Sequence, residues 1–397
     1  MSRKTIAIIA TGGTIACSDS EKGLKPSYML NEMLNELEEL QEIAVIRPVQ
    51  LMNKDSSDMT PEDWTRIAVA VYKELQYVDG IVVTHGTDTM AYTSSMLSFM
   101  IQRASKPIIV TGSQRPWNEA QTDAKRNLLD AVRVAAFGVE NDIRGVHIVF
   151  HGKIIRGCRA KKSKFLERSE LDAFDTINYP LVGLVKDKHI LMNPILQISY
   201  KNGYKDQEPI LDTQLDTRVF MLMLAPGFNT DLMDSIKEKT RAVIIQAYGL
   251  GDMPINGRDT LVPKVKEWLA EGKIVAVTSQ ACYETDLSRY ETGKRFMDMG
   301  VIPTLDMTQE SAYTKMMWAL GHKGDIESVR KLMWTNVAGE IWQLGPNGHA
   351  NGGPKTLDVM GEMARYHELT RRLYESNTQL MEVMGNIFSK IKNSQPS

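Results

Sequence analysis

The chain has 397 residues, of which 43% are hydrophobic and 24% are charged, and its formal net charge is −2. This composition is typical of a soluble globular protein, and the length suffices for roughly two or three domains. The near-neutral charge argues against a broad electrostatic footprint for nucleic acid, and no apolar run reaches the ~18 residues of a membrane span.

The first part of the chain alternates between predicted strands and helices. The apolar run 6–10 predicts a strand, which ends in the loop Thr11-Gly12-Gly13-Thr14. The apolar positions between 29 and 40 predict a helix, and 43–52 predicts a strand. Thr60-Pro61-Glu62-Asp63 predicts a helix start, because it offers a capping hydroxyl, a proline in the first turn and acids at the positive end of the dipole.

The alternation continues around a second polar loop. The apolar run 81–83 predicts a buried strand, and the loop Thr84-His85-Gly86-Thr87-Asp88 leads from it into a helix. Two further strands, at 107–110 and 145–150, enclose a helix at 123–137. This repeated order implies a doubly wound, mostly parallel sheet, and such sheets carry their chemistry in the loops that follow the strands.

The second part of the chain divides into three kinds of sequence. Residues 153–178 are strongly basic and predict an irregular segment, and a second strand and helix block runs from 219 to 335. A turn-rich stretch at 345–354 then precedes a long amphipathic helical stretch. The predicted units are an N-terminal domain with the polar loops at 1–186, an inter-domain connection at 187–216, a smaller C-terminal α/β domain at 217–344, and a linker with a helical extension at 345–397.

The three cysteines, Cys17, Cys158 and Cys282, are scattered and odd in number. They form no disulfide framework, and the apolar run after the N-terminus is too short for a signal peptide, so we predict a cytoplasmic protein. Cys17 lies near the first polar loop and is expected to be a small buried residue rather than a reactive thiol.

The polar loops support several interpretations on their own. Thr11-Gly12-Gly13-Thr14 could cradle an anion with its amide groups or present a threonine nucleophile, and by itself an ordinary turn is the favoured interpretation. His85 is expected to be a packed, hydrogen-bonded residue, since no other histidine or cysteine stands at a metal-ligand spacing from it. Lys161 and Lys162 by themselves indicate a solvated basic loop.

Asp88 has two interpretations of this kind. It could cap the helix that follows. Together with Asp55, Ser56 and Ser57, it would also suit the ammonium and carboxylate groups of a free amino acid.

The two polar loops resemble the two signatures of bacterial-type L-asparaginases. They are Thr11-Gly12-Gly13-Thr14-Ile15-Ala16 and Thr84-His85-Gly86-Thr87-Asp88-Thr89. Further runs fall in the family's order, namely Asp55-Ser56-Ser57-Asp58, Thr111-Gly112-Ser113-Gln114, Asn178-Tyr179-Pro180, Tyr248-Gly249 and Gly300-Val301-Ile302-Pro303. The resemblance covers about residues 4 to 340 and is greatest to the cytoplasmic type I branch.

The resemblance implies hydrolysis of L-asparagine to L-aspartate and ammonia through an acyl-threonine intermediate. It implies that Thr14 is the nucleophile and that Thr87, Asp88 and Lys162 form a second catalytic group. It assigns the α-carboxylate and α-amino group of the substrate to Asp55, Ser56 and Ser57, with Thr87 and Asp88 sharing that binding. It implies no metal or organic cofactor, no nucleic-acid or membrane partner, and a homodimer or homotetramer.

The chain departs from the family pattern at several positions. Leu24 stands where many members carry a tyrosine that assists the nucleophile, and Tyr28 lies four residues further on. Asp252 stands where several relatives have asparagine, and the segment after Gly345 has no counterpart in the shorter bacterial members. That segment could be an interaction helix or a helix docked on its own subunit.

Two rival functions follow from the same residues. One is the asparaginase-like subunit of a tRNA-dependent amidotransferase, whose relatives carry an extra segment before the first signature, whereas Thr14 comes almost at once here. The other is a catalytically silent amino-acid sensor, in which Leu24 leaves Thr14 inactive. Release of ammonia from asparagine would exclude the sensor.

Overall fold

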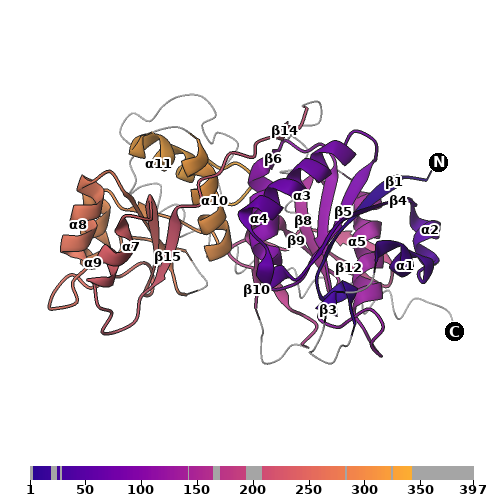
Figure 1. Cartoon of the computed structure of the whole chain (residues 1–397), viewed down its shortest axis with the longest axis horizontal. Helices are drawn as coiled ribbons and strands as arrows, with labels where there is room; N and C mark the ends of the chain where they lie inside the picture. The colour runs from indigo at the N-terminus through magenta and orange to yellow at the C-terminus, as the bar shows by residue number, and fades with distance from the viewer. Residues whose placement is uncertain are drawn as a thin grey trace.

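The computed structural model describes residues 3–18, 25–26, 29–141, 143–163, 170–193, 208–281, 284–322 and 325–341. Leu24, Tyr28, Cys282 and the predicted extension 345–397 lie outside these ranges. The described chain forms two lobes, a larger one from the first half of the sequence and a smaller one from the second (Figure 1). Within the described ranges, no helix is long and apolar enough to cross a membrane.

The larger domain is built on an eight-stranded sheet in the order β13-β12-β9-β8-β7-β5-β1-β4. Its strands are β1 (Thr5–Gly12), β4 (Val45–Lys54), β5 (Gly80–Thr84), β7 (Pro107–Thr111), β8 (Gly145–Phe150), β9 (Lys153–Arg156), β12 (Gly183–Lys186) and β13 (His189–Met192). Neighbours from β4 to β8 are parallel, whereas β9, β12 and β13 continue the sheet antiparallel. The predicted doubly wound, mostly parallel sheet is confirmed.

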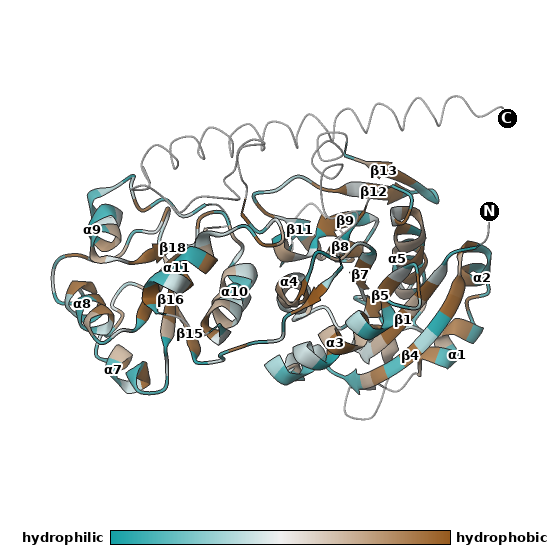
Figure 2. Ribbon diagram, turned by 90° about the horizontal axis from the view of Figure 1, so that it is seen from above, coloured by the Kyte–Doolittle hydropathy of each residue, from teal (hydrophilic) through white to brown (hydrophobic). Residues whose placement is uncertain are grey.

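Helices cover both faces of this sheet, because alternate residues of each strand point to opposite sides. Ile6 and Ile8 of β1 pack with one set of helices, whereas Ala7 and Ile9 pack with the other. Figure 2 shows the two helical layers on either side of the strands. The first set is α1 (Leu30–Asn35), α2 (Glu39–Ile43) and α5 (Ala124–Gly138), and the second is α3 (Pro61–Glu74) and α4 (Met90–Met100).

The start of α3 follows the sequence prediction, and the helix before it does not. Thr60 caps α3 by accepting a hydrogen bond from the Asp63 amide, and the Asp63 carboxylate accepts one from the Thr60 amide. The single helix expected between 29 and 40 is instead the pair α1 and α2. Glu36 ends α1 with a bond from its amide to the Leu34 carbonyl, so the same apolar positions are divided between two short helices.

In the segment 153–178, predicted to be irregular, the described residues 153–163 and 170–178 include regular structure, so the prediction is wrong for them. They form β9, the 3₁₀ turn η3 (Gly157–Arg159) and the antiparallel pair β10 (Ala160–Lys162) and β11 (Phe174–Thr176). Several basic residues in these two ranges are paired with acids. Lys153, for example, is 8% exposed, and its Nζ lies 2.7 Å from Asp172 Oδ1.

The smaller domain contains a four-stranded parallel sheet in the order β15-β16-β17-β18. Its strands are β15 (Val219–Met223), β16 (Ala242–Ala247), β17 (Ile274–Ser279) and β18 (Ile302–Pro303), and its helices are α7 (Leu232–Lys237), α8 (Val262–Ala270), α9 (Glu291–Met299), α10 (Gln309–Gly321) and α11 (Ile326–Trp334). The block of strands and helices predicted from 219 to 335 is present.

The two domains share one apolar core. The cluster that contains α3 and α4 continues into α10, α11 and one face of the smaller sheet. Phe99 of α4 stacks on Trp318 of α10, and Tyr92 meets Tyr313 edge to face. The short strand β14 (Ile210–Leu211) also pairs with β6 (Ile101–Gln102) of the larger domain. A core of this kind holds the two lobes in a fixed relation.

The range 187–216, predicted as the inter-domain connection, begins within the larger domain, because β13 at 189–192 is part of its sheet. The predicted domain limits otherwise stay a prediction.

Candidate active site

Three loops meet where the neighbouring strands β4, β1 and β5 end. The loop after β1 enters the 3₁₀ turn η1 (Thr14–Ala16), and the loop after β4 forms the 3₁₀ turn η2 (Ser56–Asp58). The loop after β5 contains Thr87 and Asp88 and leads into α4. Because these strands are adjacent and parallel, the polar residues at their carboxyl ends are brought to one edge of the sheet.

The first and third loops touch through two glycines. Gly13 has φ 84°, a left-handed conformation that glycine adopts without strain, and a Cβ on it would collide with the backbone of Gly86. A Cβ on Gly86 would lie 2.5 Å from the hydroxyl of Ser56 in the second loop. Thr14 and Thr87 follow these two glycines directly. The close approach therefore places one predicted catalytic threonine on each side of the contact.

Lys162 reaches this edge from a different part of the fold. It ends β10, and its Nζ lies 2.8 Å from Thr87 Oγ1 and 2.6 Å from Asp88 Oδ1. Thr87 is 5% exposed, while the side chains of Asp88 and Lys162 are 64% and 32% exposed. Thr87, Asp88 and Lys162 thus form one hydrogen-bonded group, with a buried hydroxyl and an ion pair that faces solvent.

Three of the residues predicted to hold an amino acid lie at η2, where Asp55 caps the turn and Ser56 and Ser57 begin it. Asp55 Oδ1 accepts hydrogen bonds from the Ser57 amide at 2.8 Å and the Ser57 hydroxyl at 2.7 Å. Ser56 is 3% exposed, and its carbonyl accepts a bond from the Thr89 hydroxyl at 2.7 Å. The Thr89 bond, which was not predicted, links the second loop to the third. Asp55 and Ser57 are exposed at the mouth of the site.

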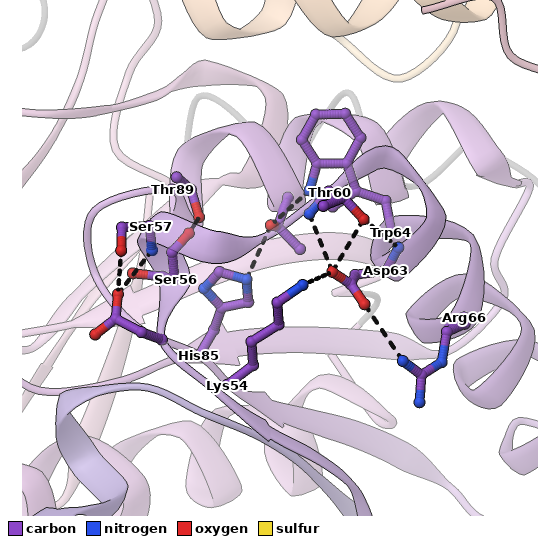
Figure 3. A network of polar contacts seen from close by, with 11 residues as sticks. Lys54, Ser56, Ser57, Thr60, Asp63, Trp64, Arg66, His85 and Thr89 are labelled. Carbon is purple, nitrogen blue, oxygen red and sulfur yellow. Dashed lines mark hydrogen bonds and ion pairs between the residues drawn. The ribbon is translucent and has the colours of Figure 1, made fainter. Parts of the chain in front are cut away.

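A charged cluster around Asp63 supports η2 from the side (Figure 3). Lys54, at the end of β4, lies 2.5 Å from Asp63 Oδ2, and Arg66 lies 3.3 Å from Asp63 Oδ1. Burial opposes ionisation of Asp63, but the hydrogen bonds from Lys54 and Thr60 outweigh it and lower the pKa of this carboxyl. The cluster ties the end of β4 to the start of α3.

His85 is a structural residue, as predicted. Its ring is 0% exposed, with Nδ1 2.7 Å from the Gly86 carbonyl and Nε2 2.9 Å from the Thr93 hydroxyl, which also accepts from the indole of Trp64 (Figure 3). These partners fit a neutral ring that donates from Nδ1 and accepts at Nε2. Burial lowers the pKa of His85 to about 4, so the ring fixes the Gly86 peptide without carrying charge.

Buried neutral histidines make stability depend on pH. Burial, with the charge of Arg156 adding to it, also lowers the pKa of His147 on β8 to about 3. An unfolded histidine titrates near pH 6.5, so below that pH the unfolded state binds protons that the native state does not. We expect the free energy of unfolding to fall as the pH drops from about 6.5 to about 4, by on the order of a few kcal/mol.

Urea unfolding between pH 7.5 and 4.5, compared for wild type and His147→Gln, tests this expectation. At neutral pH the variant should be less stable, because the buried imidazole of His147 and its contacts are lost. Its free energy of unfolding should also fall less steeply than that of wild type as the pH is lowered. Equal slopes for the two proteins would show that His147 does not contribute. Carboxylates contribute equally to both proteins, and the difference between the slopes therefore isolates the histidine.

Cys17 lies beside the first loop and is a poor nucleophile. Its side chain is 2% exposed, and its Sγ lies 3.3 Å from the Gly13 carbonyl. Burial and the charge of Asp55 raise the pKa of the Cys17 thiol to about 11. The residue is protonated at neutral pH and packs under the loop, as expected of a small buried side chain.

A cavity of about 560 Å³ opens beside Lys162. Its walls are formed by Gln114, Arg115, Pro116, Glu119, Lys162, Ser163, Glu170 and Ala173. Arg115 and Glu170 form an ion pair across it. The Gln114 of the predicted Thr111–Gln114 run thus lines the approach to Lys162.

The run Asn178-Tyr179-Pro180 and the departure at Asp252 lie in different places. Tyr179 is 6% exposed and packs under the guanidinium groups of Arg156 and Arg159. Asp252 is held within the smaller domain, where its carboxylate accepts a hydrogen bond from the Thr292 hydroxyl. Neither position could be placed from sequence spacing alone, because the partners come from distant segments.

Comparison with known proteins gives consistent results for both domains. The family model for the asparaginase N-terminal domain matches residues 5–196, and the model for the glutaminase/asparaginase C-terminal domain matches residues 218–333. An L-asparaginase from Thermococcus kodakarensis is 40% identical over 338 residues, which are 85% of this chain and 98% of that protein.

Solved structures and a second class of relative complete the comparison. The thermostable L-asparaginase structure from T. kodakarensis gives a TM-score of 0.76 at 39% identity, covering 86% of this chain and all of that one. L-asparaginase I from Vibrio cholerae gives 0.75 at 30%, with the same coverage. A component of the glutamyl-tRNA(Gln) amidotransferase from Pyrococcus abyssi is 36% identical, over 85% of this chain and 76% of that protein.

Proposed function

Because this chain belongs to the asparaginase family, we propose that it is an L-asparaginase, which hydrolyses the side-chain amide of L-asparagine to L-aspartate and ammonia. The observation that carries the proposal is the group formed by Lys162, Thr87 and Asp88, which stands beside the contact between Gly13 and Gly86. That group contains a threonine hydroxyl, a cation and a carboxylate, and Thr14, which directly follows Gly13, would add a second hydroxyl for one small substrate.

We assign the nucleophile to Thr14. Its oxygen attacks the amide carbon of asparagine, the C–N bond breaks, and ammonia leaves after the nitrogen has gained a proton. The product of this step is an ester between Thr14 and the aspartyl group. Water then attacks the ester carbon, which releases aspartate and returns the proton to the Thr14 oxygen. The atoms balance without any external oxidant, reductant or cofactor.

Thr87 and Lys162 support these proton transfers. Lys162 as an ammonium donates to both the Thr87 oxygen and Asp88, so it stabilises negative charge that develops on the Thr87 hydroxyl. The Thr87 proton then points away from Lys162 and is free to bond the leaving nitrogen or the attacking water. Because the hydroxyl is buried, this electrostatic support is stronger than it would be in water.

Substrate binding follows from the charges at the mouth. The carboxylates of Asp55 and Asp88 suit the α-ammonium of an amino acid, and the serine hydroxyls of η2 suit its α-carboxylate. Both sets come from the second and third loops, which are joined by the close approach of Gly86 to Ser56 and by the hydrogen bond from Thr89 to the Ser56 carbonyl. The assignment of Asp55, Ser56, Ser57, Thr87 and Asp88 to substrate binding is part of the proposal, as is a homodimer or homotetramer. The cytoplasmic location stays a prediction.

A second candidate function comes from the glutamyl-tRNA(Gln) amidotransferase relatives, at 36% and 37% identity over the same residues. Such a role would use the same amide hydrolysis, with the ammonia passed to another protein chain. A test on the isolated chain separates the two, because an asparaginase works alone on free amino acid.

The direct test is ammonia release by the purified chain from L-asparagine and from L-glutamine. We expect turnover of asparagine at the ordinary enzymatic rate of about 1–10³ s⁻¹, with Thr14→Ala as the inactive control. Activity that appears only with a partner protein and glutamyl-tRNA(Gln) would favour the amidotransferase role. Binding of asparagine without any turnover would reject hydrolysis and favour the sensor.

A further inference from the structure

The strand that carries Lys162 also faces the second domain. Successive residues of a strand point to opposite sides. Lys162 points to Thr87 and Asp88, while the Nζ of Lys161 lies 3.4 Å from Gln309 Oε1 and 3.4 Å from Glu310 Oε1. Both acceptors stand in the first turn of α10. The strand β10 is paired only with β11 among the strands of the described ranges, so its position depends on what holds its ends.

Arg159, directly before β10, is held by acceptors of the second domain. The residue is 0% exposed, and its Nε donates to the Gly339 carbonyl at 2.7 Å. One terminal nitrogen donates to the Asp306 carboxylate at 2.6 Å and to its carbonyl at 3.0 Å. Asp306 is itself 1% exposed. A buried charge is tolerated only when it is paired, so this pair strongly disfavours other positions of η3.

The neighbouring contacts restrict the same turn. The Tyr179 ring lies under both guanidinium groups, with centroid distances of 5.3 Å to Arg156 and 5.0 Å to Arg159. Arg156 also donates to the Ala338 carbonyl at 2.6 Å. Gly339 has φ 89°, and a Cβ there would collide with the Arg156 guanidinium. The backbone of residues 338–339 therefore fits closely against the turn.

The segment that supplies these carbonyls is itself anchored. Glu340 and Lys315 form an ion pair of 2.6 Å in which both side chains are 0% exposed. The Glu340 carboxylate also accepts from the amides of Val337 and Ala338. Lys315 in turn donates to the carbonyls of Met333 and Thr335. The turn 336–340 is thus fixed to α10 before it meets Arg159.

We propose that Arg159 is a positioning residue for Lys162. Through Asp306 and Gly339, the second domain fixes η3 and the start of β10, and it thereby holds the lysine against Thr87 and Asp88. The inference rests on the proposed function, because it assumes that Lys162 takes part in the reaction. It predicts that the second domain affects turnover through contacts within one chain.

The expected effect falls on kcat. A shift of about 1 Å in a catalytic group can cost about 10²-fold in rate. Arg159→Met should therefore lower kcat for asparagine about 10- to 100-fold and change KM by a smaller factor, since only Thr87 and Asp88 among the proposed binding residues contact Lys162, whereas Asp55, Ser56 and Ser57 lie on another loop. Arg159→Lys, which keeps the charge, and Asp306→Asn should give smaller losses of the same kind.

The decisive measurement is a double-mutant cycle with Lys162→Met. If Arg159 acts through Lys162, Arg159→Met should change kcat less than about twofold in the Lys162→Met background. Losses that multiply in the double variant, or an Arg159→Met enzyme with the kcat of wild type, would overturn the proposal. A Lys162→Met enzyme with normal kcat would instead contradict the proposed function, so the two failures are distinguishable.

A matched control accounts for general loss of stability. Phe296→Leu alters the core between α9 and the outer face of the smaller sheet, which does not include η3 or β10. It should lower the melting temperature as Arg159 variants do, yet leave kcat unchanged. If Arg159→Met does not fold, the double-mutant cycle with Lys162→Met is made with Arg159→Lys and with Asp306→Asn instead. Equal kcat losses in Phe296→Leu and the Arg159 variants would also overturn the proposal.

Discussion

Thr14→Ala should lose nearly all asparagine turnover, with kcat lower by about 10⁴-fold or more. Removal of a nucleophile leaves only the binding and electrostatic contributions to catalysis, which is why such changes are among the largest known in enzymes. The substitution removes the hydroxyl of a half-buried residue at the start of η1, so the fold and KM should change little. Steady-state ammonia release by wild type and variant measures the effect.

Two further variants serve as controls for Thr14→Ala. Thr14→Ser keeps a hydroxyl and should retain measurable activity, which alanine should not. Thr11→Val removes a buried hydroxyl in the same loop that donates to the Thr84 carbonyl at 2.7 Å. It should cost about 1 kcal/mol of stability while keeping kcat within about tenfold of wild type. Equal losses of kcat in Thr11→Val and Thr14→Ala would mean that the activity depends on the geometry of the loop and that Thr14 is not shown to be a nucleophile.

For Thr87, the second threonine, we expect a trapped intermediate rather than a simple loss of turnover. Thr87→Val removes the hydroxyl that Lys162 contacts but leaves Thr14 in place. If Thr87 assists the attack of water on the ester, a covalent aspartyl adduct should accumulate on Thr14 in the variant and be seen by acid quench and intact mass. An adduct that persists in Thr14→Ala would show that the nucleophile is another residue.

Local sequence patterns predicted the fold well wherever the structure is made by near neighbours. The cap formed by Thr60 and Asp63 is present because the two residues stand three apart, and β8 has the predicted limits of 145–150 because four of its six residues are apolar and follow one another closely. The same logic failed at Glu36. Apolar spacing from 29 to 40 is compatible with one helix, and only the tertiary contacts of the chain select two.

Charge was a misleading guide between 153 and 178. A basic run normally indicates a solvated surface, yet Lys153 and Arg159 are buried because acids far away in the sequence pair with them. Asp306 is 147 residues from Arg159. No spacing rule links them, so the ordered strands of this segment could not be derived from the sequence.

In the candidate site, too, some residues could be placed from the sequence and others could not. The loops with Thr14, Asp55 and Thr87 could be expected to meet, because each follows a strand of a parallel sheet. Lys162 could not, since β10 lies outside that sheet and its contact with Thr87 spans 75 residues. The resemblance to asparaginases, rather than any pattern of charge, singled out that lysine from Lys161 beside it.

Lys162→Met should reduce kcat by about 10³-fold, because it removes the cation that bonds both Thr87 and Asp88. Lys161→Met is the matched control, since the adjacent lysine points to α10 and its two contacts are longer, at 3.4 Å. It should keep kcat within about tenfold of wild type. Similar losses in the two variants would indicate that β10 simply needs positive charge.

The chemical role of Lys162 can be resolved with Lys162→Arg. In the structure the Lys162 Nζ contacts two oxygens, Thr87 Oγ1 and Asp88 Oδ1, which is the arrangement expected of a group that stabilises charge. Arginine stays protonated in proteins, so it can replace the charge but cannot act as a base. We therefore expect Lys162→Arg to exceed Lys162→Met by about tenfold in kcat. If arginine is as inactive as methionine while KM and folding are preserved, Lys162 must give up its proton during the reaction, and Thr87 is then activated by a base rather than by a neighbouring charge.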